Sequence, residues 1–125
     1  MAGNLYSSLD VSEGVKTAPA AATLLADTGQ IAESSAYSKH VDLHIVGWME
    51  TAGAAAVTVV IEHRNAANDG NIRSTEVNLR PADNIVIPYQ AEIADNERIR
   101  VIVGATAPAA GIDVQVAIVG QVVTS

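Results

Sequence analysis

Three side chains that could do chemistry lie close together in the stretch HVDLH, at residues 40–44. Imidazole and carboxylate groups are common metal ligands and general bases. If the stretch is a β-strand, His40, Asp42 and His44 share one face, and neighbouring ligands lie about 6.5–7 Å apart. Adjacent pairs could then chelate zinc, or Asp42 could orient one imidazole by a hydrogen bond. The alternative, which we favour, is the solvated face of a strand.

Other chemical signatures are weak in this sequence. His63 follows a predicted strand and could approach HVDLH from a neighbouring strand. No serine lies in a Gly-x-Ser-x-Gly elbow, and no glycine-rich phosphate loop or EF-hand spacing is present. A calcium site between loops stays open, although turn chemistry explains the same aspartates without a metal. These aspartates are Asp27, Asp69, Asp83 and Asp95. We therefore expect neither an enzyme nor a cofactor.

The composition favours a β-rich core and excludes several partners. The chain has 125 residues with no Phe, no Cys, one Trp and three Tyr, so Ala, Val and Ile supply most of its apolar mass. The net charge of -7 argues against direct binding to nucleic acid or to an anionic membrane surface. The N-terminus lacks the features of a signal peptide, and no apolar run approaches ~20 residues. We expect a soluble protein that is not secreted.

Short apolar runs separated by turn signals predict seven or eight strands. The runs cover residues 22–26, 41–50, 55–64, 72–80, 84–89, 97–105 and 111–123. This spacing is typical of an antiparallel β-sandwich, here of jelly-roll-like type, and it predicts an all-β domain over residues 22–125. Residues 1–21 lack this pattern and are expected to form an extended N-terminal arm, ordered where it lies on a partner or on its own domain.

Strand alternation assigns the faces of the predicted sheets. Ile99, Val101 and Val103 should face inward, like the alternate apolar residues of 57–61 and 112–118. Several apolar residues fall on the outer faces instead: Val46, Trp48, Val60, Ile102, Ala117, Val119 and Val123. A monomer of this size rarely exposes so much apolar surface, so we expect another chain to cover it. The predicted interface residues are Leu5, Tyr6, Leu9, Val46, Trp48, Ile102 and Val119.

Two stretches resemble small virion proteins of tailed bacteriophages. One is ATLLADTGQIAESSAYSKHVDLHIVGWMETAGAAAVTVVIEHRN, where a Thr-Leu-Leu-Ala strand, a polar spacer, an alternating strand and a small-residue turn precede a second strand. The other is PYQAEIADNERIRVIVGATAPAAGIDVQVAIVG, at residues 88–120, which is similar to the closing strands of such sandwiches. HVDLH is not part of the shared layout.

The resemblance implies a structural virion protein, namely a capsid cement or decoration protein. Its implied partners are the major capsid protein and further copies of itself, with a trimer favoured. Its implied location is the outer capsid surface, after synthesis in the host cytoplasm. Two alternatives remain: a receptor- or glycan-binding module of a fibre or spike, and a zinc-dependent enzyme or metal-stabilised oligomer built on HVDLH.

Overall fold

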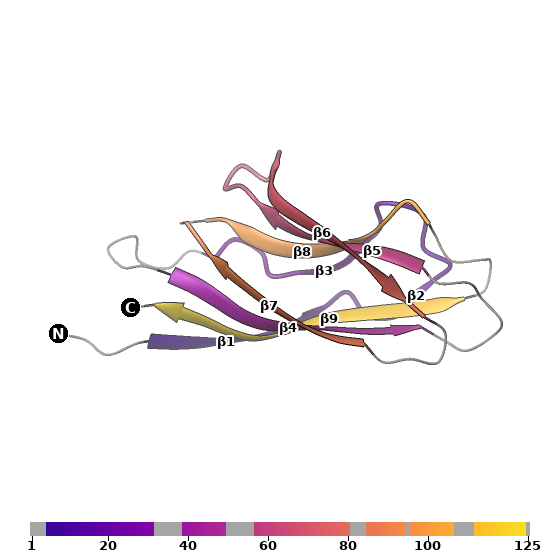
Figure 1. The fold of residues 1–125 in the computed structure, drawn as a ribbon, viewed down its shortest axis with the longest axis horizontal. Helices are drawn as coiled ribbons and strands as arrows, with labels where there is room; N and C mark the ends of the chain where they lie inside the picture. Colours follow the sequence, from indigo (N-terminus) through magenta and orange to yellow (C-terminus); the bar gives the residue numbers. More distant parts are fainter. Residues whose placement is uncertain are drawn as a thin grey trace.

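The chain forms two antiparallel β-sheets that pack face to face as two layers (Figure 1). The computed structural model describes residues 5–31, 39–49, 57–80, 85–94, 96–106 and 112–124. Within these ranges the regular elements are nine strands. They are β1 (Leu5–Ser12), β2 (Lys16–Thr17), β3 (Leu24–Asp27), β4 (Lys39–Met49), β5 (Val57–Arg64), β6 (Asn71–Leu79), β7 (Ile85–Glu92), β8 (Arg98–Val103) and β9 (Asp113–Thr124). The predicted all-β sandwich is confirmed.

The strand order is that of a jelly roll. Sheet A has the order β1-β9-β4-β7, with the short β2 also paired to β9, and sheet B has the order β3-β8-β5-β6. Four antiparallel pairs are nested in the sequence, namely β1 with β9, β3 with β8, β4 with β7 and β5 with β6. This nesting is what results when one long hairpin winds into two sheets. The fold by itself assigns no function.

The core lies between the sheets and consists mainly of β-branched side chains. Alternation confirms the predicted inward positions, because Val57, Val59 and Ile61 are buried, as are the alternate residues of β8 and β9. Leu43 and Ile45 of β4 face them from sheet A. The same alternation leaves the intervening residues of every central strand on an outer face.

The N-terminal segment lies on this chain's own domain over the residues described. β1 pairs with β9 from Leu5↔Thr124 to Ser12↔Ala117, and β2 continues along β9 at Lys16↔Val114. The predicted arm therefore contributes an edge strand to sheet A, and the two ends of the described chain meet at one edge of the molecule. None of the described residues belongs to a helix that could cross a membrane.

Candidate functional site

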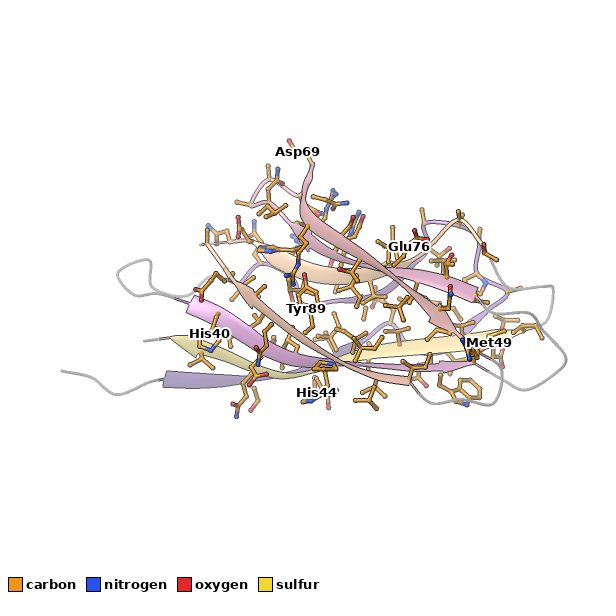
Figure 2. The ribbon with its side chains drawn as sticks, in the orientation of Figure 1. His40, His44, Met49, Asp69, Glu76 and Tyr89 are labelled. Atoms are coloured by element: carbon orange, nitrogen blue, oxygen red, sulfur yellow. The ribbon has the colours of Figure 1, made fainter. Side chains whose placement is uncertain are left out.

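HVDLH lies in β4, in the middle of sheet A, with its polar side chains on the outer face. Val41 and Leu43 are fully buried, whereas Asp42 and His44 are exposed and His40 is half-buried. Asp42 Oδ1 accepts a hydrogen bond of 3.3 Å from Gln90 Nε2 on β7. His44 points away from the sandwich, toward the outside of sheet A (Figure 2). The predicted strand is observed, and the face that carries Asp42 and His44 is exposed to solvent, as predicted.

His63 does not approach these residues. It lies at the end of β5 in sheet B, is 5% exposed, and its Nε2 lies 2.9 Å from Glu97 Oε1. The same Glu97 oxygen accepts a hydrogen bond from the backbone N–H of Ala94. His63 thus closes one end of the core. In the described ranges, no cluster of three or more His, Asp or Glu side chains is arranged to hold a metal ion.

From His44 onward the outer face of sheet A becomes apolar, with His44 itself lying between Pro88 and Val119. Six residues form this apolar patch: Val46, Trp48, Val86, Pro88, Ala117 and Val119. They are adjacent because β4 pairs with both β7 and β9, which aligns Val46 with Val86 and with Ala117. Val86 is 59% exposed and Trp48 is 36% exposed. Sheet pairing therefore gathers residues from three strands into one surface.

The predicted interface residues divide among three places. Val46, Trp48 and Val119 lie together in the apolar patch, but Ile102 lies on the outer face of sheet B, next to Leu24 and Val60. Leu9 packs against the core from β1. Leu5 and Tyr6 pair with Thr124 and Val123, and their side chains lie outside the described part. Val123, which alternation places on the outer face, is only 5% exposed.

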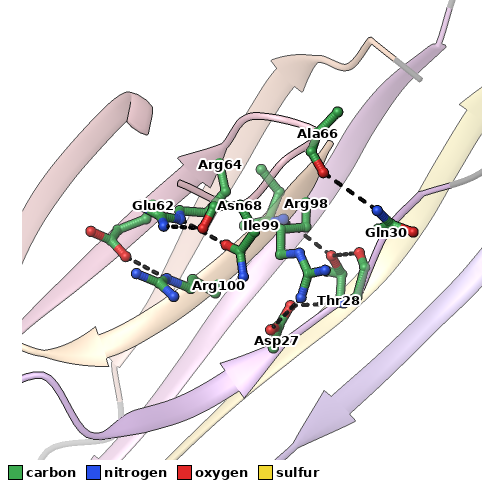
Figure 3. Close-up of polar contacts among 11 residues, drawn as sticks. Asp27, Thr28, Gln30, Glu62, Arg64, Ala66, Asn68, Arg98, Ile99 and Arg100 are labelled. Atoms are coloured by element: carbon green, nitrogen blue, oxygen red, sulfur yellow. Dashed lines mark hydrogen bonds and ion pairs between the residues drawn. The ribbon is translucent and has the colours of Figure 1, made fainter. Parts of the chain in front are cut away.

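A polar network crosses one part of the outer face of sheet B (Figure 3). Glu62 on β5 accepts hydrogen bonds from Arg100 Nε at 2.6 Å and from Asn71 Nδ2 at 2.7 Å. Arg98 on β8 pairs with Asp27 on β3 at 3.0 Å. These contacts link all four strands of the sheet. Since Ile61 and Ile99 face inward, alternation puts Glu62 and both arginines on the outside, but it does not reveal that Glu62 is only 6% exposed.

The charge of Glu62 is stabilised despite its burial. Burial raises the pKa of this carboxyl group, but hydrogen bonds from Asn71 and Arg100, together with nearby positive charges, outweigh it. The positive charges of Arg100 and Arg64 act in the same direction. The pKa of Glu62 is therefore below its ordinary value, and the residue is ionised at neutral pH.

The tip of the β5–β6 hairpin, residues 65–70, projects from sheet B and is held by hydrogen bonds within the hairpin. Arg64 donates from Nε to Asn68 Oδ1 at 2.9 Å and from Nη2 to the Asn68 carbonyl at 2.6 Å. Asn65 and Asp69 exchange two further hydrogen bonds, and Asn68 adopts a left-handed φ of 58°. The sequence signal for this reversal was Asp69-Gly70, and the structure places the turn there. All these hydrogen bonds join residues of the hairpin, so they stabilise its turn.

A shallow depression of about 410 Å³ lies where β4, β6 and β7 meet. His40, Arg73, Gln90, Ala91 and Glu92 line it. Arg73 bridges the two sheets there, donating from Nε to Tyr89 Oη at 3.2 Å and from Nη2 to the Gln90 carbonyl at 3.0 Å. Its guanidinium lies 4.5 Å from the centre of the Tyr89 ring, so that ring is covered.

Comparisons with known proteins add little to this geometry. No protein-family model matches the sequence, and a search of curated proteins found no match. Among solved structures, a chain in the structure of infectious bursal disease virus, Gx strain, is similar with a TM-score of 0.46 and 8% identity. The similarity covers 97% of this chain and 36% of that chain, so this chain spans about a third of its neighbour's length. A TM-score below 0.5 carries no functional inference, and the proposals below depend on this chain's own surfaces.

Proposed function

We propose that this protein is a structural subunit of a virion, of the capsid cement or decoration type, and not an enzyme. One observation carries the proposal: Trp48 and Val86 are exposed side by side with further apolar residues on the outer face of sheet A. At strand spacing each outward residue covers about 33 Å², so the six residues of the apolar patch cover roughly 200 Å². The largest patches on soluble monomers are about 300–600 Å², so this patch has the size of an apolar interface centre that is completed by a polar rim.

The patch has the character of a protein-binding surface. Its six residues carry no formal charge, and Trp48 is of the type most often found as an interface anchor. The charged side chains of the network around Glu62 lie on the opposite side of the sandwich, in sheet B. The largest exposed aromatic side chain therefore lies on the face opposite this charged network. The chain's net charge of -7 also favours a location away from packaged nucleic acid, such as the outer surface of the capsid.

In this proposal the partners are the major capsid protein and other copies of this chain. A subunit that binds only the assembled shell stabilises the shell by mass action, in proportion to RT ln(1 + [L]/Kd) at each site. The chain then needs rigidity and a complementary surface but no catalytic group. The resemblance to phage virion proteins favours a trimer as the assembled form, and light scattering of the purified protein measures that number.

The test is binding to capsids assembled from the major capsid protein of the same genome. Replacing Trp48 and Val86 together with serine is expected to lower the bound copies per capsid at least tenfold, because the buried apolar area is lost. Ile72→Ser is the matched control, since Ile72 is 53% exposed but lies on β6 of sheet B. Co-sedimentation measures occupancy, and thermal unfolding verifies that each variant folds. Absence of binding by the wild-type protein would contradict the proposal.

The alternative of a glycan-binding module has less support from the described residues. Sugar binding by β-sandwich modules uses exposed aromatic rings for stacking, and Tyr89 is 6% exposed and covered by Arg73. Trp48 is exposed, but it lies on a flat sheet among aliphatic side chains. A receptor-binding module would place its contacts in exposed loops, for which 65–71 and 106–111 are the candidates, and the polar side chains of 65–71 bond to one another or to side chains of β5. The other, 106–111, lies outside the described residues except for residue 106.

A further inference from the structure

The outer face of sheet A has an approximate symmetry about β9, one of its two inner strands. β1 flanks β9 on one side and β4 flanks it on the other. Val119 of β9 is paired with Asp10 on β1 and with His44 on β4. One acidic and one imidazole side chain, both exposed, therefore lie on opposite sides of Val119, each about one strand spacing away.

Consider a two-fold axis above the outer face of sheet A and parallel to β9. A rotation of 180° about this axis places a second copy face to face with the first, with its β1 over β4 and its β4 over β1. A second copy placed by that half-turn sets its Asp10 over His44 of the first copy, and its His44 over the first copy's Asp10. The next ladder row, Ser12–Ala117–Val46, sets Val46 over the partner's Ser12. The preceding row sets Asp42 over the partner's Ser8, because both pair with Gln121. In these rows no two acidic groups face each other.

We propose that a second copy of this chain covers this face in a two-fold dimer, with reciprocal Asp10–His44 contacts across the interface. The inference rests on the proposed function only in taking the apolar patch as an assembly surface. A carboxylate acceptor opposite an imidazole N–H donor at two symmetric positions favours this occupant, because any other protein would have to supply both partners independently. Trp48 lies beyond the last row that includes a β1 residue, and Val86 and Pro88 lie on β7, outside the exchanged strands, so all three stay available to a capsid.

The area of this face sets the strength of the contact. Three strands over about eight residues give roughly 350 Å² per copy, or about 700 Å² in total. Stable interfaces bury about 1,200–2,000 Å², so the dimer is expected to be weak in solution, with micromolar or weaker affinity. Local concentration on a capsid compensates for that weakness. The favoured trimer does not conflict with this dimer. In a trimer each copy contacts its two neighbours through two different surfaces, so the outer face of sheet A can form the two-fold contact between copies of different trimers.

The experiment is charge exchange followed by mixing. Asp10→Lys removes the carboxylate that accepts from His44, and His44→Glu sets an acidic group over Asp10 in the homodimer. Each is expected to weaken dimerisation about tenfold or more. In an equimolar mixture, the introduced lysine of one variant faces the introduced glutamate of the other, and the unchanged Asp10 and His44 also face each other. Dimer formation should therefore return on mixing. Sedimentation equilibrium of the chain alone, up to roughly millimolar concentration at low salt, measures the mass.

Asp42→Lys provides the matched control, since it changes the same charge on the same face but faces Ser8. A mixture of Asp42→Lys with His44→Glu is expected to show no recovery, because the introduced glutamate still faces Asp10. A wild-type chain that stays monomeric at all concentrations overturns the dimer, and so does a mixture of Asp10→Lys with His44→Glu that does not recover. If either result is found while the wild-type chain still binds capsids, only the two-fold contact is ruled out. If the wild-type chain does not bind capsids, the proposed function is ruled out.

Discussion

Two neighbouring residues of β5, Glu62 and His63, show how a sandwich accommodates ionisable groups. They point to opposite faces, yet both are almost fully buried, at 6% and 5% exposure. Each is compensated: Glu62 by Arg100 and Asn71, His63 by Glu97. A buried polar group without such a partner costs about 1–3 kcal/mol. These pairings explain how sheet B keeps charged residues on central strands.

The lowered pKa of Glu62 predicts an acid-dependent part of stability. A carboxyl group whose pKa is lower in the folded chain than in the unfolded chain adds stability above the unfolded value, about 4.3. That stability is lost as pH falls through the lower folded pKa. Glu62→Gln is therefore expected to cost about 1–3 kcal/mol at pH 7, and much less near pH 3. Urea unfolding of both proteins at the two pH values measures the difference.

The exposed Glu76 on β6 supplies the control for this prediction. Glu76→Gln should change the free energy of unfolding at pH 7 by no more than about 0.5 kcal/mol, as is usual for exposed positions. An equal loss of stability by the Glu62→Gln variant at both pH values would count against the role of the carboxylate charge.

At the scale of elements, β9 is the strand on which sheet A depends. It pairs with β1, β2 and β4, and it carries one side of the apolar patch, at Ala117 and Val119. Gly120 interrupts its otherwise regular backbone with a φ of 143°, in a region that side-chain-bearing residues rarely adopt. A Cβ at this position would collide with the Asp42 carbonyl oxygen and with Leu43 Cα. The close approach of β4 to β9 therefore requires glycine here.

Gly120→Ala is expected to destabilise the protein by about 2–3 kcal/mol, because the strained φ and the backbone collision act together. Gly70→Ala is the control, since its Cβ would meet only the Asn65 side chain, at 3.2 Å. We expect that variant to stay within about 1 kcal/mol of the wild type. Equal unfolding midpoints in guanidinium for wild type and Gly120→Ala would show that β4 and β9 can separate without cost.

At the scale of the whole molecule, the jelly roll joins the first and last described strands. Since β1 pairs with β9 from Leu5↔Thr124 onward, part of the structure forms only when residues more than a hundred positions apart meet. Loop-closure entropy opposes such contacts, so folding is expected to be slow compared with helical domains of this size. The N-terminal segment is consequently part of the domain's stability as well as a candidate for assembly.

Deletion of residues 1–12 is expected to lower the free energy of unfolding by about 2–4 kcal/mol. The loss follows because Leu9 and Val11 no longer pack on the core and the backbone edge of β9 becomes unpaired. Chemical denaturation measures the change, and Ser8→Ala on the same strand should leave stability within about 0.5 kcal/mol. If the truncated chain unfolded at the wild-type midpoint, β1 would be a dispensable addition to sheet A.

Strand alternation in the sequence determined which residues face inward and which face outward. It identified the outer position of His44 and the inner position of Val116 because the period of two is a local property of the backbone. It also located the hairpin reversal at Asp69-Gly70, since turn chemistry is equally local.

Only the tertiary structure decided which outward residues meet. Ile102 and Trp48 are both apolar and outward, yet strand order places them on opposite sheets. Glu62 is buried because arginine and asparagine reach it from two other strands, and Asp10 faces across β9 to His44 because both pair with Val119. Such neighbours are set by non-local pairing, which no window of adjacent residues contains.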